Sequence, residues 1–433
     1  MALLLILSVS GFHNPRFCLH SRDCPHQVLF SADSDYEEEA SPSKKRRGPA
    51  RVRPIRPTAS TDKVQARRVE AQARHNEALQ DPTLLSNLKF QERTDIHPAT
   101  KRAITEVMGL QSMTQIQAKT YAAALAGDSV LGRARTGTGK TLAYLLPALE
   151  RLLGSDLELY RPGRNIGILI VAPTRELAIQ IADQAKAILS FHNDMDVACI
   201  YGGTKIAHDT RRLSGKTMPT ILVATPGRLI DHLEGTRIER RKFSDIIKET
   251  RIVVLDEADR LFEGFSKETT SILSFMPRPE KRQTLLFSAT VPNKLRGFLK
   301  GSMKIEFTEV DCVNDGEVQS ETNARVEQTF FVLENIDQYI PILVALLQEA
   351  MKEENHKVVV FFPATKIVRF FADFFNVGLK IPVLELHSRM SQSSRNRASS
   401  SFREAKRGVL FTSDVSARGK KKCIYMCHKL YCS

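Results

Sequence analysis

The 433-residue sequence is 42% hydrophobic and 26% charged, a balance typical of a folded protein long enough to bury two cores. Its net charge of +14 favours a polyanionic partner, and its seven scattered cysteines indicate reduced thiols and argue against a disulfide framework. The apolar run from Ala2 to Val9 is far shorter than the roughly 20 residues of a membrane-spanning helix. We therefore expect an intracellular protein with no membrane association and no stable oligomer.

Residues 1–85 differ in composition from the rest, and we expect a disordered, basic N-terminal extension there. Met1 to Phe30 contains a single acid, Asp23, and resembles an organelle transit peptide, although Leu3 to Leu7 also fits a weak secretory signal. The basic run Ser43 to Arg47 suits a nuclear address, an RNA-tethering arm or a solvated linker. The expected compartment is a mitochondrion or chloroplast, with the nucleus or cytoplasm as alternatives.

A glycine-rich loop before an apolar helix is the first motif that carries chemistry. Gly137 and Gly139 let backbone amides turn towards a polyphosphate. Lys140 would meet the β- and γ-phosphates, and the Thr141 hydroxyl would be a ligand of Mg²⁺. An ordinary glycine-rich turn is the alternative. The predicted ATP-binding loop comprises Ala134, Arg135, Thr136, Gly137, Thr138, Gly139, Lys140 and Thr141.

The apolar run from Arg251 to Leu255 predicts a buried strand, and the acids Asp256, Glu257 and Asp259 follow it directly. Acids at the carboxyl end of a strand in an open parallel sheet lie where ligands bind. Asp256 would hold the metal and Glu257 would orient or polarise the attacking water, so the predicted catalytic residues are Lys140, Asp256 and Glu257. A charged strand end is the alternative. Loop and acids together predict a site for ATP and Mg²⁺.

These motifs, in this order, resemble those of the DEAD-box ATP-dependent RNA helicases, in particular the plant organelle-related members. The resemblance covers about Phe90 to Gly419 and implies two RecA-like α/β domains. In the segment Thr114 to Gln117 it implies that Gln117 reads the adenine edge, while Phe90 stacks on the base.

The resemblance also implies contacts with an RNA backbone. The strand-like runs Ile168 to Val171 and Thr220 to Val223 precede two of the motifs concerned, so we expect these motifs in loops of one sheet. Arginines, threonine hydroxyls and glycine amides bind phosphates without reading bases, although a solvated surface charge is the alternative for each arginine. The implied RNA-binding residues are Pro173, Thr174, Arg175, Gly202, Gly203, Thr225, Pro226, Gly227 and Arg228.

A further motif, Ser288, Ala289 and Thr290, follows the strand-like run Gln283 to Phe287. It resembles the family segment that links the nucleotide state to domain closure through hydrogen bonds to the acidic segment. A capping turn at a strand end is the alternative.

A second α/β unit is predicted from about Ala324. We place the first domain at residues 86–310, a linker at 311–323 and the second domain at 324–419. The predicted strands of the second domain are Glu327 to Leu333, Lys357 to Phe362, Pro382 to Leu386 and Arg407 to Thr412.

The resemblance stops at Gly419. Residues 420–433 contain no arginine, and the family's His-Arg-x-Gly-Arg-x-x-Arg segment, whose arginines reach the γ-phosphate, is not present in the sequence. We therefore interpret the chain as truncated within the second domain, with impaired activity and an open sheet edge around Val409 to Phe411. Translated non-coding sequence is the favoured interpretation of the tail. The less favoured one is a zinc site at Cys423, Cys427, His428 and Cys432.

The sequence thus predicts a RecA-like α/β ATPase with a parallel sheet, followed by an incomplete second RecA-like domain. Its cofactors would be ATP and Mg²⁺, its partner RNA, and its function RNA remodelling coupled to ATP hydrolysis. The alternative is a non-catalytic regulator that binds ATP and RNA and competes with a full-length relative.

Overall fold

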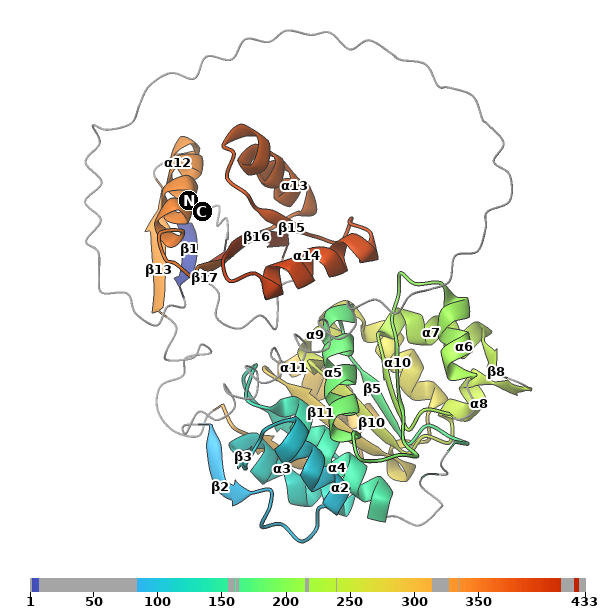
Figure 1. Cartoon of the computed structure of the whole chain (residues 1–433). Helices are drawn as coiled ribbons and strands as arrows, with labels where there is room; N and C mark the ends of the chain where they lie inside the picture. The colour runs from blue at the N-terminus through green and yellow to red at the C-terminus, as the bar shows by residue number, and fades with distance from the viewer. Residues whose placement is uncertain are drawn as a thin grey trace, which may run out of the picture. The chain divides into compact units, whose positions relative to one another are not determined.

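The computed structural model describes residues 2–7, 84–154, 160, 163–214, 218–238, 240–313, 327–333, 335–413 and 424–427. These residues form two α/β bodies, one over residues 84–313 and one mainly over residues 327–413 (Figure 1). Most of the predicted extension and most of the predicted tail lie outside the described residues. The described part contains no helix with both the length and the apolar character that crossing a bilayer requires.

The first body is built on a sheet of seven strands in the order β12-β4-β11-β10-β5-β7-β6, and every neighbouring pair is parallel. Because parallel strands all end at the same edge, the loops that follow them gather along that edge. The strands are β4 (Val130–Arg133), β5 (Ile168–Val171), β6 (Val197–Ile200), β7 (Ile221–Ala224), β10 (Ile252–Asp256), β11 (Gln283–Ser288) and β12 (Thr308–Asp311).

Helices cover both faces of this sheet (Figure 1). Successive strand residues alternate between two apolar cores: in β10, Ile252 and Val254 lie in one and Val253 and Leu255 in the other. Burial on both faces accounts for the continuous apolar runs of the sequence. The first core includes residues of α3 (Gln115–Ala126), α4 (Lys140–Gly154) and α5 (Arg175–Ile188). The second includes residues of α6 (Ile206–Leu213), α7 (Pro226–Gly235), α8 (Phe243–Ile247), α9 (Ala258–Gly264), α10 (Ser266–Phe275) and α11 (Asn293–Ser302).

Short elements complete the first body. They are the antiparallel pair β2 (Leu85–Lys89) and β3 (Ser112–Thr114), the antiparallel pair β8 (Arg237–Ile238) and β9 (Arg241–Lys242), and the helical turns α2 (Pro98–Arg102), η1 (Ala103–Val107) and η2 (Pro279–Lys281).

The second body has a sheet in the order β13-β1-β17-β14-β16-β15. The four strands predicted for it are confirmed to within two residues at each end. Phe362, Phe375 and Phe411 are among the fully buried aromatic residues of its main core. Its strands are β1 (Ala2–Leu7), β13 (Glu327–Val332), β14 (Lys357–Phe362), β15 (Leu384–Leu386), β16 (Gly408–Ser413) and β17 (Ile424–Cys427). Its helices are η3 (Ile336–Gln338), α12 (Tyr339–Ala350), α13 (Thr365–Asp373), η4 (Phe374–Gly378) and α14 (Gln392–Glu404).

Two segments that the sequence placed outside the domains belong to this sheet. β1 pairs antiparallel with β13 and β17, and β17 pairs parallel with β14. The predicted disorder of the extension is therefore wrong for Ala2–Leu7, and the exclusion of the tail from the fold is wrong for Ile424–Cys427. The predicted open edge is also wrong, because β16 lies between β14 and β15 and its Leu410 is fully buried. The physical reason is that extended segments pair with strand edges that would otherwise leave amides and carbonyls unpaired.

A buried arginine in the first body gives a test of the fold. Arg282, just before β11, is 4% exposed and donates hydrogen bonds to the carbonyls of Leu273 (3.2 Å), Pro277 (2.6 Å) and Ser302 (2.9 Å). Burial lowers the pKa of this guanidinium to about 10. Substitution Arg282→Met leaves buried carbonyls without donors, so we expect the free energy of unfolding to fall by about 2–4 kcal/mol in urea denaturation followed by circular dichroism.

The matched control is Arg278→Met, because Arg278 is exposed at the start of the same turn. It should change the free energy of unfolding by less than about 0.5 kcal/mol. Equal effects of the two substitutions would show that the buried hydrogen bonds of Arg282 do not stabilise the fold.

Candidate nucleotide site and nucleic-acid surface

The phosphate loop joins the end of β4 to the start of α4. Gly137 and Gly139 have φ angles of 84° and 90°, in the left-handed region that glycine adopts without strain. A Cβ on Gly139 would also lie 2.5 Å from Nε2 of Gln117. Within the loop, the Thr138 hydroxyl donates to the Arg135 carbonyl (2.8 Å). Ala134 is buried, Thr136 and Gly137 are exposed, and Thr141 is half-buried in the first turn of α4.

Lys140 is a buried cation at the base of this loop. It is 8% exposed, and its Nζ has no hydrogen-bond partner within the described part of the chain. Its charge favours the ionised forms of Asp256 and Glu257. A buried ammonium without partners is costly, and an anionic ligand at the loop would supply the missing acceptors.

Two donors hold the carboxylate of Asp256, which ends β10 and is 3% exposed. The Tyr144 hydroxyl donates to Oδ2 (2.9 Å), and the backbone amide of Glu257 donates to Oδ1 (2.9 Å). Burial raises the pKa of Asp256, whereas Lys140 and these two hydrogen bonds favour the charged form. The carboxylate is thus fixed in direction before any ligand binds.

Glu257 has a strained backbone, with φ 47° and ψ 53°. This left-handed conformation costs a residue with a Cβ on the order of 1–3 kcal/mol, and such strain is concentrated at functional positions. Burial, and then the charge of Asp256, raise the pKa of Glu257. The Arg260 guanidinium lies 3.7 Å from its Oε2 and favours the charged form. The predicted catalytic residues Lys140, Asp256 and Glu257 therefore share one electrostatic environment.

The third acid, Asp259, connects the acidic segment to the end of β11. Its Oδ2 accepts hydrogen bonds from the Thr290 hydroxyl (2.8 Å) and the Thr290 amide (3.3 Å). Its backbone amide donates to the Ser288 hydroxyl (3.1 Å). The segment Ser288, Ala289, Thr290 makes the contacts that the predicted coupling role requires, and that role stays a prediction.

Both residues expected to hold adenine are buried in this structure. Phe90 is 0% exposed and its ring belongs to the first core; its stacking on a base stays a prediction. Gln117 is 3% exposed; its Oε1 accepts from the Thr114 amide (2.9 Å) and its Nε2 donates to the Gly139 carbonyl (3.1 Å). In this structure Gln117 holds the phosphate loop, because a buried amide is satisfied by the nearest backbone groups.

The predicted RNA-binding motifs follow neighbouring strands. Thr174 accepts a hydrogen bond from the Leu177 amide (3.2 Å) and begins α5 after β5. The Arg175 guanidinium reaches the loop after β6, where a Cβ on Gly203 would lie 2.5 Å from its Nη1 and Gly202 lies beside it. Gly203 has a φ of 92°. Burial lowers the pKa of Arg175, which is half-buried.

Arg228 is a buried arginine in the first turn of α7. It is 6% exposed and forms an ion pair with Asp209 of α6. It also donates to the Thr204 carbonyl (2.6 Å) and the Thr204 hydroxyl (3.2 Å). Buried acceptors hold two nitrogens of its guanidinium, and its direct contact with RNA stays a prediction. In the same motif Thr225 and Pro226 are buried at the start of α7 and Gly227 is exposed; Pro173 is buried after β5.

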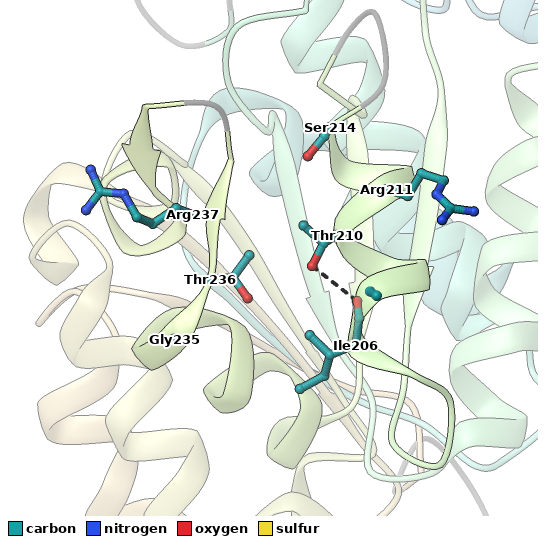
Figure 2. A pocket seen from close by; sticks show the side chains of 8 residues that line it. Ile206, Thr210, Arg211, Ser214, Gly235, Thr236 and Arg237 are labelled. Atoms are coloured by element: carbon teal, nitrogen blue, oxygen red, sulfur yellow. Dashed lines mark hydrogen bonds between the residues drawn. The ribbon is translucent and has the colours of Figure 1, made fainter.

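A hollow of 530 Å³ lies beside α6, away from the phosphate loop (Figure 2). In Figure 2 the Arg211 and Arg237 side chains lie on opposite sides of it and point away from each other. The Thr210 hydroxyl donates to the Ile206 carbonyl (3.1 Å). The hollow is lined by Ile206, Ala207, Thr210, Arg211, Ser214, Gly235, Thr236 and Arg237. No predicted ATP- or RNA-binding residue lines it.

The residues at the phosphate loop fit Mg²⁺ bound together with a nucleotide. Mg²⁺ in such sites takes one or two protein oxygens, and phosphates and water supply the rest. The Asp256 carboxylate and the Thr141 hydroxyl are suitable oxygens, and the unpartnered Lys140 suits the phosphates. Within the described residues, no group of three or more His, Cys, Asp or Glu side chains could hold a metal ion.

Tyr144 is the residue of this site that sequence reasoning missed. The sequence predicts an apolar helix after the loop and does not single out Tyr144 within it. The available signal was its spacing, four residues after Lys140, which places both side chains on the same face of α4.

Comparison with known proteins agrees with this geometry. Residues 114–298 match the family model described as DEAD/DEAH box helicase, and residues 338–421 match the helicase conserved C-terminal domain. The chain belongs to the DEAD-box family of RNA helicases. It is 39% identical to "DEAD-box ATP-dependent RNA helicase 25" of Oryza sativa subsp. japonica over 78% of this chain and 55% of that protein. It is 40% identical to helicase 26 of the same species over 77% of this chain and 60% of that protein.

Solved DEAD-box structures share the fold. Mss116p bound to ssRNA and AMP-PNP is 29% identical, with a TM-score of 0.66 over 77% of this chain and 67% of that one. A second Mss116 structure, bound to ssRNA and UDP-BeF, has a TM-score of 0.67 at 29% identity, over 78% of this chain and 68% of that one. The DEAD-box chain described here spans little more than half the length of the two rice relatives.

The phosphate loop of this DEAD-box chain can be tested at one glycine. In Gly139→Ala the new methyl group would enforce a strained φ and clash with Gln117. At about 1–3 kcal/mol of strain, we expect the affinity for ADP, measured by isothermal titration calorimetry, to fall by about ten-fold or more.

The matched control is Gly154→Ala at the end of α4. Apart from its chain neighbours and the backbone of its own helix, no atom of the described residues lies within 4 Å of a Cβ at this position. ADP affinity should stay unchanged in this variant. If Gly139→Ala also bound ADP normally, the loop would not need the conformation described here.

Proposed function

We propose that this chain binds Mg-ATP at the loop after β4, binds RNA at the loops after β5, β6 and β7, and couples ATP hydrolysis to RNA remodelling. Two buried charges carry the proposal: the ammonium of Lys140, which has no hydrogen-bond partner among the residues that the structure describes, and the carboxylate of Asp256. A folded protein retains such a costly arrangement where a ligand completes it. The solved relative Mss116p, which binds ssRNA and AMP-PNP, supports the same assignment.

Each residue at the nucleotide loop receives a role. Lys140 binds the β- and γ-phosphates, while Thr141 and Asp256 hold Mg²⁺. When bound, Mg²⁺ neutralises charge on the phosphates. Glu257 orients the attacking water, and its strained backbone holds its carboxylate next to Asp256. Asp259, held by Ser288 and Thr290, relays changes at the acidic segment to the end of β11.

RNA binding is assigned to the other half of the same sheet edge. The strands β5, β7 and β6 adjoin one another, as do β4, β11 and β10. Arg175, held against the Gly202–Gly203 loop, is the cation best placed for a phosphate. Arg228 positions that loop through Thr204 and Asp209. Because such contacts reach the phosphates of the RNA and not its bases, binding should be largely independent of the RNA sequence and should weaken as the salt concentration rises.

A non-catalytic ATP- and RNA-binding regulator is the second candidate. RNA binding with no ATP turnover would support the regulator over the enzyme.

Substitution of Glu257 separates the two functions. We expect Glu257→Gln to lower RNA-stimulated ATP turnover by about 100-fold or more, because the amide cannot polarise water, while ATP and RNA still bind. Turnover is measured as phosphate release with and without single-stranded RNA.

Glu263→Gln, in the same helix segment and exposed, is the control and should keep full turnover. Turnover that survives Glu257→Gln would exclude the assigned role of Glu257.

Alanine substitutions of Arg175 and Arg228 should have different effects, one on RNA binding and one on stability. Arg175→Ala should weaken binding of single-stranded RNA and reduce the slope of log affinity against log salt by about one, because it removes one phosphate contact. Arg228→Ala should instead lower the free energy of unfolding by about 3–5 kcal/mol, because it leaves Asp209 buried without its partner. Fluorescence anisotropy and urea denaturation measure the two effects.

Arg211→Ala removes an exposed arginine of the same body and serves as the charge-matched control. Equal losses of RNA affinity in Arg175→Ala and Arg211→Ala would contradict a localised contact at Arg175.

A further inference from the structure

Tyr144 is a fully buried tyrosine whose hydroxyl reaches the acidic segment. It lies one helical turn after Lys140 on α4 and donates to Oδ2 of Asp256 at 2.9 Å. A phenylalanine would fill almost the same volume, so the hydroxyl adds this hydrogen bond to the packing. The phenolic hydroxyl of a tyrosine is a hydrogen-bond donor at neutral pH, which matches this contact with a carboxylate oxygen.

The ring of Tyr144 is held in place by its neighbours. It packs against Phe287 of β11, with the ring centroids 5.4 Å apart. Phe287 in turn lies over Gly132 of β4, where a Cβ would approach its ring to 2.5 Å. The direction of the hydroxyl is thus set by packing inside the sheet and its covering helix.

The other donor to Asp256 constrains the orientation of the carboxylate less. The amide of Glu257 is adjacent in the chain and fixes only Oδ1. With that amide as the sole donor, the carboxylate could still pivot about Oδ1. The hydrogen bond from the Tyr144 hydroxyl to Oδ2 prevents this rotation. Groups that hydrogen-bond a metal-binding carboxylate typically change metal affinity by 10–100-fold when removed.

We propose that Tyr144 is a positioning residue that holds the Asp256 carboxylate in the orientation in which it binds nucleotide-associated Mg²⁺. This inference rests on the proposed function, in which Asp256 holds the metal. It adds a requirement: the chain needs the tyrosine hydroxyl, and not merely an aromatic ring, at position 144.

The test is the Mg²⁺ dependence of nucleotide binding. A fluorescent ADP derivative is titrated with the full chain in EDTA and at increasing MgCl₂. Mg²⁺ should increase the affinity for the ADP derivative. In Tyr144→Phe we expect the Mg²⁺ concentration that gives half of this increase to rise by about ten-fold, with the affinity in EDTA unchanged. This readout does not depend on turnover, and a purely structural role of Tyr144 would lower both affinities together.

Tyr160→Phe is the matched control. Tyr160 is 5% exposed and its hydroxyl shares a hydrogen bond with Thr220 at 2.7 Å, outside the nucleotide loop. This variant loses a buried hydroxyl of the same kind and should keep the wild-type Mg²⁺ dependence. In an Asp256→Asn background, Tyr144→Phe should have no further effect on Mg²⁺ dependence, because its partner is already altered.

Two outcomes separate the inference from the function on which it rests. If Mg²⁺ increases the ADP affinity of the wild-type chain and of Tyr144→Phe at the same concentration, the positioning role is overturned and the proposed function is not. If the wild-type chain shows no Mg²⁺-dependent ADP binding, the proposed nucleotide site itself is overturned.

Discussion

Parallel hydrogen bonding between the strands of the first sheet is the constraint on which the site depends. The register pairs Asp256 with Phe287 across β10 and β11, and Ser288 with Arg133 across β11 and β4. The phosphate loop, the acidic segment and the Ser288–Thr290 segment therefore start from adjacent positions at one edge, although they are far apart in the sequence. A slip of one strand by a single residue would reverse which side chains face each core and would misalign the loops.

The second constraint is the balance of buried charge. Lys140, Asp256 and Glu257 are all largely withdrawn from water, and burial raises the pKa of both acids while Lys140 opposes that shift. Hydrogen bonds from Tyr144 and from a backbone amide stabilise the buried carboxylate of Asp256, and Arg260 lies 3.7 Å from that of Glu257. A phosphate and a cation that bind together would pair with Lys140 and with the two carboxylates. Because their charges are opposite, the net charge of the site would change little, which suits reversible binding.

Sequence patterns predicted the strands well because strands buried on both faces leave continuous apolar runs, as in Ile168–Val171 and Lys357–Phe362. They also placed the phosphate loop and the acids, because those motifs depend on local spacing. They failed where a side chain finds its partner across the fold. The ion-pair partner of Arg228, Asp209, lies in another helix, and a solvated surface charge is the ordinary expectation for an arginine. The burial of Phe90 and the contact of Gln117 with the Gly139 carbonyl are also not readable from the sequence, because packing and nearby backbone groups decide them. Pairing of Ala2–Leu7 with β13 is a contact across more than three hundred residues, which no local pattern reports.

Gly132 shows how far from the loop the geometry of the site begins. It lies inside β4, two residues before the loop, and the Phe287 ring occupies the space where its side chain would stand. Alanine at this position would push that ring towards Tyr144 and, through it, disturb the oxygen that Tyr144 holds. The tolerance of the candidate nucleotide site to mutation is therefore set partly by a strand residue outside the phosphate loop, and alanine there would mimic a defect in the loop itself.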